Sequence, residues 1–96
     1  MTRLENSIEQ SFVAKLKKRN LDLECFKFDP TGQNGFPDRL VVLPHGRCLW
    51  IEFKRPGEEP RELQKHNIKR LQSMGHRVAV FDNADRAFEW VMEVVL

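Results

Sequence analysis

Two carboxylates and a lysine stand where a β-hairpin would bring them together. Asp38 precedes one apolar, β-rich run of residues, and Glu52 and Lys54 lie at the end of the next run. If Leu43 and Arg47 pair across the turn between the runs, the same register places Asp38 directly across from Glu52, with Cβ atoms about 4.5–5.5 Å apart. Side chains alternate along a strand, so Lys54 shares a face with Glu52. The three side chains are therefore predicted to form one cluster.

The chemistry of this cluster favours a hard divalent cation. Two carboxylates held this close on a mostly apolar sheet repel, and one of them tends to stay protonated. A divalent cation removes that conflict, because carboxylate oxygens, water and a phosphate are the usual ligands of Mg²⁺. No cysteine or histidine joins the cluster, so a zinc-type site is not expected. A lysine beside the metal can orient or help deprotonate an attacking water, or stabilise the charge that grows on a phosphate.

A helix and a strand are predicted before the hairpin. An apolar stripe recurs every four residues near the N-terminus, at Leu4, Ile8, Phe12 and Leu16. This period predicts an amphipathic helix. Thr2 and Glu5 have the spacing of a capping box, and Asn20 is expected to end the helix. Alternating polar and apolar residues from 23 to 28 then predict a strand.

The hairpin itself is preceded by a long loop, 29–37, which contains two glycines and two prolines. Loops of this length in a small domain are often functional. The hairpin strands are predicted at 39–43 and 47–53. Between them, Pro44 suits the second position of a type I turn, and Gly46 suits the left-handed residue that follows. Both strands are apolar on both faces, so helices should cover the sheet on each side.

The remaining sequence predicts a helix, a strand and a helix. The second helix is expected over about 60–74, with a proline in its first turn and a stop at Gly75. A fourth strand is expected at 77–81. Asp82 or Asn83 then caps the last helix. The predicted order of elements is αβββαβα.

Composition and charge exclude several classes of protein. The 96 residues suit one domain, 1–96, near the lower end of the size that buries a self-sufficient core. A net charge of +2 is too small to argue by itself for a polyanionic partner. The first residues lack the apolar stretch of a signal peptide, and no apolar run approaches the roughly 18 residues that span a bilayer. We therefore expect no signal peptide and a soluble protein of the cytoplasm with no membrane contact. Cys25 and Cys48 lack metal-ligand spacing and are expected to be reduced, buried thiols.

The motifs of the site resemble a known family. Gly35-Phe36-Pro37-Asp38, followed by Glu52-Phe53-Lys54, resembles the PD-(D/E)xK nuclease signature. More narrowly, the Gly-x-Pro-Asp-Arg and Ile-Glu-Phe-Lys segments, a charged loop and a glutamine-bearing helix resemble the VRR-NUC group, which includes small stand-alone phage proteins. The likeness extends from Glu9 to Phe81. It implies a restriction-endonuclease-like α/β fold, with an αβββαβ core and a mixed sheet flanked by helices on both sides.

The resemblance also implies roles for individual residues. A Mg²⁺ or Mn²⁺ ion would be held by two carboxylates, a backbone carbonyl and an acid of the first helix, namely Asp38, Glu52, Phe53 and Glu9. Lys54 would serve the attacking water. Gln64 would support the site or contact a phosphate. The expected products are a 5′-phosphate and a 3′-hydroxyl.

Several further side chains could either bind the substrate or have an ordinary structural or surface role. Arg39 could contact a phosphate or pair with an acid. A basic row beside the site could bind DNA or form an ordinary solvated face: Arg55, Arg61, Lys65 and Lys69. The basic run 15–19 suits a solvated helix end better than a DNA contact. Phe36 could stack on a base or wedge a junction, or pack in the core. His45, His66 and His76 are expected at the surface without a role.

These features predict a structure-specific DNA endonuclease. One site cuts one strand, so symmetric cleavage of a four-way junction needs two copies of the chain. The last helix carries more apolar surface than one face needs, which favours a homodimer. The resemblance to stand-alone phage proteins implies a Holliday junction resolvase in a bacterial or phage-infected cell. The alternatives are a flap or nicking nuclease within a replication or repair complex, and a non-catalytic DNA-binding module.

Overall fold

The computed structural model describes residues 3–96, and its elements follow the predicted order. They are α1 (Arg3–Lys18), β1 (Glu24–Lys27), β2 (Arg39–Val42), a 3₁₀ turn (Pro44–Gly46), β3 (Cys48–Phe53), α2 (Glu62–Ser73), β4 (Arg77–Phe81) and α3 (Ala84–Val95). The proposed cap at Thr2 lies outside the described residues. No helix within 3–96 is long and apolar enough to cross a membrane.

The sheet has the strand order β1-β2-β3-β4. The pairs β1–β2 and β2–β3 are antiparallel, whereas β4 is parallel to β3 because α2 carries the chain back across the sheet. Arg39 lies opposite Ile51 and Val42 lies opposite Cys48. The amide of Leu43 donates to the carbonyl of Arg47 over 2.8 Å. The predicted hairpin register is therefore confirmed.

The turn of this hairpin differs from the predicted type I turn. Both His45 (φ 67°, ψ 31°) and Gly46 (φ 73°) are left-handed. Two successive left-handed residues are the geometry of a type I′ turn, whose twist matches that of the flanking strands. Histidine is among the residues that adopt this region more readily than most. The loop keeps the predicted left-handed Gly46 and differs from the prediction at His45.

One face of the sheet packs on α1 and α3 and forms the main core. Its buried side chains are Phe12, Leu16, Val41, Leu43, Leu49, Ile51, Phe53, Ala87 and Val91. The rings of Phe12 and Phe53 meet at 5.3 Å between centroids. Partly buried apolar residues of α3 also pack against this cluster: Phe88, Trp90, Met92, Val94 and Val95. The apolar surface of α3 therefore contributes to the core while these side chains remain partly exposed.

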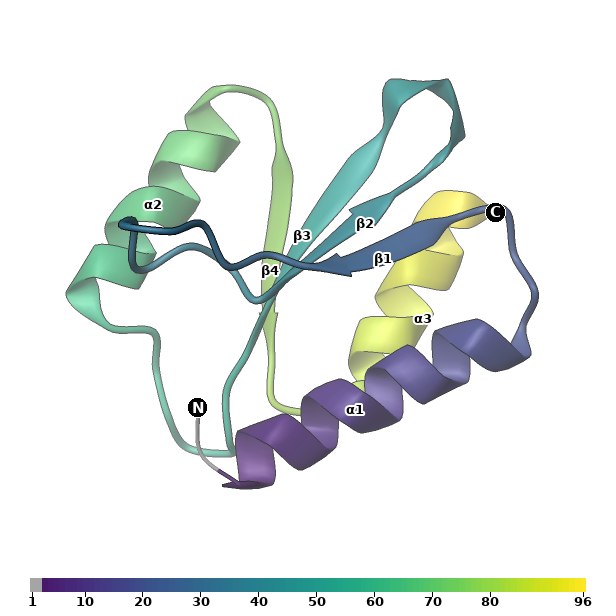
Figure 1. Ribbon diagram of the computed structural model, residues 1–96, viewed down its shortest axis with the longest axis horizontal. Helices are drawn as coiled ribbons and strands as arrows, with labels where there is room; N and C mark the ends of the chain where they lie inside the picture. Colours follow the sequence, from purple (N-terminus) through teal and green to yellow (C-terminus); the bar gives the residue numbers. More distant parts are fainter. Residues whose placement is uncertain (1–2) are drawn as a thin grey trace.

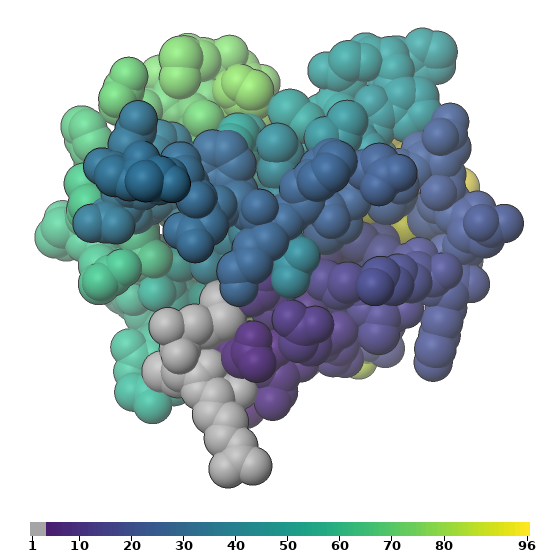
Figure 2. Space-filling view, in the orientation of Figure 1, coloured from purple at the N-terminus to yellow at the C-terminus, as the bar shows by residue number. Residues whose placement is uncertain are grey.

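The opposite face is covered by α2, as expected for a sheet with helices on both sides (Figure 1). The cover is partial, because the β2–β3 hairpin extends beyond α2 and leaves Phe26 and Val42 exposed. In the space-filling view, the hairpin tip and the C-terminal end of α2 form two separate lobes (Figure 2). Trp50 is buried on this face and donates its indole N–H to His76 Nδ1 over 3.2 Å. His76 is thus half-buried and partnered, not a free surface residue.

Helix α2 begins later than the sequence predicted. Pro60 precedes the N-cap Arg61, whose backbone is extended (φ −68°, ψ 163°), so the proline lies outside the first helical turn. The helix ends as predicted, with Gly75 at φ +88° directly after the C-cap. The N-cap of α3 is Asn83, whose side chain accepts the amide of Arg86 over 3.0 Å. Both cysteines are free thiols that are half-buried, less deeply than expected.

Candidate active site

The hairpin brings Asp38 and Glu52 together as the register requires. Asp38 lies directly before β2, and Glu52 lies in β3 on the face that packs toward α2. The two side chains are close enough for each carboxylate to influence the pKa of the other. The amide of Phe53 donates to Asp38 Oδ2 over 2.9 Å, which fixes this carboxylate against the neighbouring strand. The proposed catalytic pair is therefore one structural unit.

Glu52 is almost completely enclosed, with 2% of its surface exposed. Its Oε2 accepts a hydrogen bond from Gln64 Nε2 over 2.6 Å and lies 3.4 Å from Lys54 Nζ. The other end of the Gln64 amide is also occupied, since its Oε1 accepts the backbone N–H of Arg61 over 2.8 Å. This second contact orients the amide so that its nitrogen points at Glu52. The structure thus brings Lys54 and Gln64 to the same carboxylate.

Burial and mutual repulsion favour the protonated forms of the carboxylate pair. Burial raises the pKa of Asp38, the Phe53 amide opposes this, and the negative charge of Glu9 adds to it. The pKa of Glu52 is raised to about 8, first by burial and then by the charge of Asp38, while Lys54 lowers it. Two such carboxylates cannot both ionise cheaply near neutral pH. A proton or a cation must be shared between them.

Glu9 lies beside this pair but is engaged by Arg39. It is fully buried, and its Oε2 accepts a hydrogen bond from Arg39 Nε at 2.5 Å. The Arg39 side chain is only 11% exposed. Of its two interpretations, pairing with an acid is confirmed. The contact of Arg39 with DNA, its other interpretation, stays a prediction.

Glu5 is the acid of α1 that reaches the open site. A cavity of about 420 Å³ is lined by Glu5, Asp38, Glu52, Phe53, Lys54, Arg61 and Gln64. Glu5 is 8% exposed and stands one helical turn before Glu9. Sequence reasoning gave it only a capping role. The available signal was the four-residue spacing of the two glutamates, which places both on one helix face.

The donor set of the site fits a hard cation. Glu9 Oε1 and Glu52 Oε1 are buried, and neither has a hydrogen-bond partner among residues 3–96. A buried carboxylate oxygen without a partner is costly, and a bound cation is one way to satisfy it. Within the described chain, however, no three His, Cys, Asp or Glu side chains are already gathered as a metal-binding group. The preformed part of the site is the Asp38–Glu52 pair.

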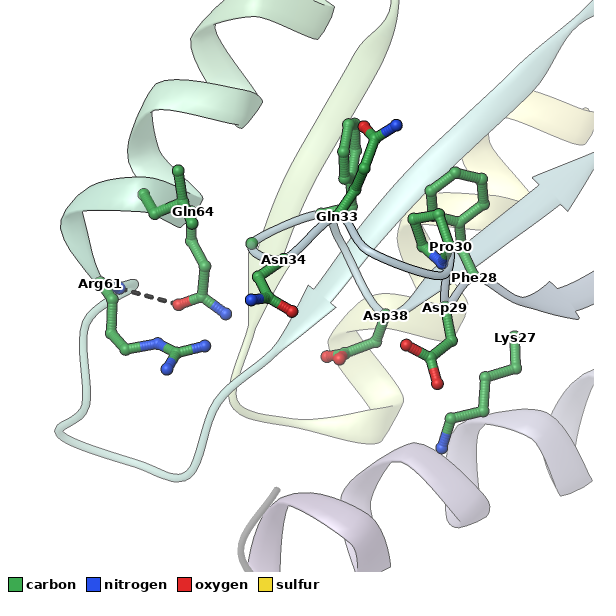
Figure 3. Close-up of a pocket in the computed structure, with 12 residues that line it drawn as sticks. Lys27, Phe28, Asp29, Pro30, Gln33, Asn34, Asp38, Arg61 and Gln64 are labelled. Atoms are coloured by element: carbon green, nitrogen blue, oxygen red, sulfur yellow. Dashed lines mark hydrogen bonds between the residues drawn. The ribbon is translucent and has the colours of Figure 1, made fainter.

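The basic row beside the site divides into two kinds. The guanidinium of Arg61 projects toward Asp38 and the side chain of Asn34 (Figure 3). In contrast, Arg55 pairs with Glu58 at 2.7 Å. Lys65 lies 3.5 Å from the carboxylate of Glu59 and 3.6 Å from that of Glu62. Lys69 is exposed on α2. Arg61 is thus the member of the row that lines the site.

A second, larger cavity opens beside the first. Its volume is about 620 Å³, and it lies between the β1–β2 loop and the N-terminal half of α2 (Figure 3). Asp38, Arg61 and Gln64 line both cavities. The two cavities are therefore neighbours that share three lining residues, and Asp38 of the carboxylate pair is one of them.

The fold is that of solved VRR-NUC domains. A solved structure described as "VRR_NUC domain" superposes with a TM-score of 0.76 at 23% identity, covering 98% of this chain and 96% of that one. Another, "VRR_NUC domain protein", gives 0.74 at 18% identity, covering 92% and 84%. No family model matches the chain.

The family follows from a sequence relative. The protein "Putative nuclease p44" of Acyrthosiphon pisum secondary endosymbiont phage 1 is 41% identical over 81 residues, which are 84% of this chain and 85% of that protein. The chain belongs to the family of this phage nuclease. The recognition of a VRR-NUC fold and of a phage nuclease relative from the sequence is confirmed.

Proposed function

We propose that this protein is a metal-dependent nuclease that hydrolyses phosphodiester bonds of DNA. The observation that carries the proposal is the Asp38–Glu52 pair, which faces across the hairpin with Lys54 and Gln64 on the same carboxylate. This arrangement lies in an open cavity lined mainly by polar side chains. A carboxylate pair with an adjacent ammonium group is suited to phosphate-ester hydrolysis and has no evident purpose in a module that only binds DNA.

Mg²⁺ or Mn²⁺ is the proposed cofactor. Asp38, Glu52 and the carbonyl of Phe53 would hold the ion, with Glu9 or Glu5 completing the set directly or through water. When bound, such an ion lowers the pKa of a water molecule and neutralises phosphate charge. Oxygen donors of this kind are the ligands that these ions prefer.

The chain's own residues supply the remaining chemistry. The Lys54 ammonium, 12% exposed, is held next to Glu52 and can position the attacking water or stabilise charge on the phosphate. Gln64 fixes the orientation of Glu52, so it acts as a positioning residue. Arg61 stands where a phosphate of the entering strand would pass. We also propose that DNA is contacted by Arg55, Lys65 and Lys69. Arg55 and Lys65 would first have to separate from their acidic partners.

The proposed substrate is branched DNA. Cleavage of a four-way junction on both strands requires two sites and hence a homodimer, whereas a flap or nick requires one site. Sedimentation at micromolar concentration separates these cases. A monomer that cuts flaps excludes the resolvase, and a dimer that cuts junctions symmetrically supports it.

A cleavage assay tests the activity itself. A four-way junction, a 5′ flap and a plain duplex are incubated with Mg²⁺, Mn²⁺ or EDTA. We expect cleavage with either metal, none with EDTA, and loss of at least about a hundredfold in Asp38→Asn, because a metal-binding carboxylate is neutralised. Asp22→Asn, a matched change at an exposed aspartate, should cleave normally. Cleavage by Asp38→Asn at the wild-type rate would show that the site is assigned wrongly.

A further inference from the structure

The β1–β2 loop is fastened to α2. Asn67, 7% exposed, donates its side-chain amide to the carbonyl of Asn34 over 3.0 Å. Gly35 follows at φ +83°, and a Cβ placed there would lie 2.7 Å from Leu63 Cγ and 2.9 Å from Asn67 Nδ2. The loop thus packs on the helix more closely than any side chain at this position would allow. The wall of the larger cavity is therefore a fixed surface.

The inner side of this cavity is aromatic. Phe36 stands edge-on to Phe28 at 5.5 Å between ring centroids, and Phe28 meets Trp50 at 4.8 Å. Trp50 is in turn tied to His76. Phe28 and Phe36 line the cavity and are half-buried. A chain of ring contacts therefore holds these two side chains in place beside the opening.

Polar groups project into the cavity from two elements. The side-chain amide of Asn34 and the guanidinium of Arg61 point toward each other across the opening, with Asp38 beyond them (Figure 3). Because the Asn67 contact uses the Asn34 backbone carbonyl, the Asn34 side chain is not needed for that contact. An amide offers both donors and acceptors, as the edge of a nucleobase does. Arg61 supplies positive charge at the boundary with the catalytic cavity.

We propose that this cavity receives an unpaired nucleotide of the substrate strand next to the bond that is cut. The inference rests on the proposed nuclease function and specifies its substrate. A volume of about 620 Å³ lies within the ordinary range of small-molecule sites. A base inside a duplex is stacked and paired, so only a flipped or unpaired base can enter such a space. Aromatic rings then offer it a stacking surface, and the Asn34 amide contacts its edge.

The test compares two flaps of equal length and charge in EDTA, where no cleavage occurs. One flap consists of thymidines and the other of abasic residues, each on the same duplex, and affinity is measured by fluorescence anisotropy. We expect the wild-type protein to bind the thymidine flap about fivefold tighter or more. Asn34→Ala and Phe36→Leu should reduce this ratio toward one. Thr31→Ala, an exposed change in the same loop outside the cavity, should retain it.

The outcomes separate the two proposals. Equal affinity of the wild-type protein for both flaps would overturn the nucleotide site, even if the protein cleaves DNA with Mg²⁺. A base preference that Asn34→Ala removes would support the site, even if no cleavage were found and the nuclease proposal failed. If Phe36→Leu unfolds the protein, the exposed Asn34→Ala variant still decides the question.

Discussion

Gln64 joins the start of α2 to the catalytic carboxylate. One end of its amide accepts the N–H of Arg61, at the N-cap of the helix, and the other end donates to Glu52 Oε2 over 2.6 Å. Because both ends are used, the amide cannot rotate without breaking a contact. The position of Glu52 in the sheet is thereby coupled to the position of a helix that begins nine residues after the end of β3.

Replacing this glutamine should affect both stability and catalysis. Gln64→Ala removes a cap and leaves a buried carboxylate with one donor fewer, which should cost about 1–3 kcal/mol of unfolding free energy. We expect kcat to fall by about tenfold, with KM little changed, because Glu52 is less well oriented. Urea unfolding and steady-state kinetics measure both effects. Gln72→Ala, at an exposed position of the same helix, is the control. A wild-type kcat in the folded Gln64→Ala variant would show that Gln64 does not position Glu52 for catalysis.

The raised pKa of Glu52 predicts how stability depends on pH. The pKa is about 8 in the folded protein and 4.5 in an unperturbed glutamate, so the folded state binds the proton more tightly than the unfolded state. Stability from this group is therefore present in full below pH 4.5 and is lost as the pH rises through 8. In EDTA, Glu52→Gln should be more stable than wild type by a few kcal/mol at pH 9 and should lose this advantage near pH 4. A difference that does not vary with pH contradicts the assignment.

The buried pair of Glu9 and Arg39 should be far more important for stability than an exposed pair. Arg39→Ala leaves the Glu9 charge buried without its partner, so we expect a loss of about 3–5 kcal/mol. The double variant Glu9→Ala/Arg39→Ala should lose less than the sum of the single losses. Lys15 and Asp85 pair at 2.7 Å on the surface, and Lys15→Ala should cost less than about 1 kcal/mol. Similar losses in Arg39→Ala and Lys15→Ala would show that Arg39 is not structurally buried in solution.

Metal binding should be measurable without cleavage. A ligand that binds only the folded state raises Tm with its concentration. Mg²⁺ at millimolar concentration should raise the Tm of the wild-type protein, and Asp38→Asn should abolish the shift. Glu5→Gln should require several-fold more Mg²⁺ for the same shift, because Glu5 lines the cavity of the carboxylate pair. Glu62→Gln, an exposed change, is the matched control. A Tm shift of wild-type size with Mg²⁺ in Asp38→Asn would show that the metal binds elsewhere.

The hairpin and the carboxylate pair could be predicted from the sequence because their geometry is local. A turn of fixed length sets the register, and the two-residue period of a strand then determines which side chains face each other. The facing of Asp38 and Glu52 follows from those two rules. The position of Lys54 on the same face as Glu52 follows from the same alternation of side chains.

Features that depend on packing between distant segments were not predictable in this way. Which of Glu5 and Glu9 reaches the open cavity depends on how α1 crosses the sheet, and the helical period does not specify this. The ion pair of Glu9 with Arg39 and the contact of Asn67 with Asn34 join residues at least 30 positions apart. The sequence likewise does not show how much of the apolar surface of α3 is covered by the core.

The close fit of Gly35 against α2 limits how the protein can move. Because the loop and the helix lie in direct contact, the pocket beside them cannot widen unless the first turns of α2 shift as well. The same turns carry the amide that grips Glu52. Any shift of these turns on ligand entry would therefore also move the amide that orients Glu52.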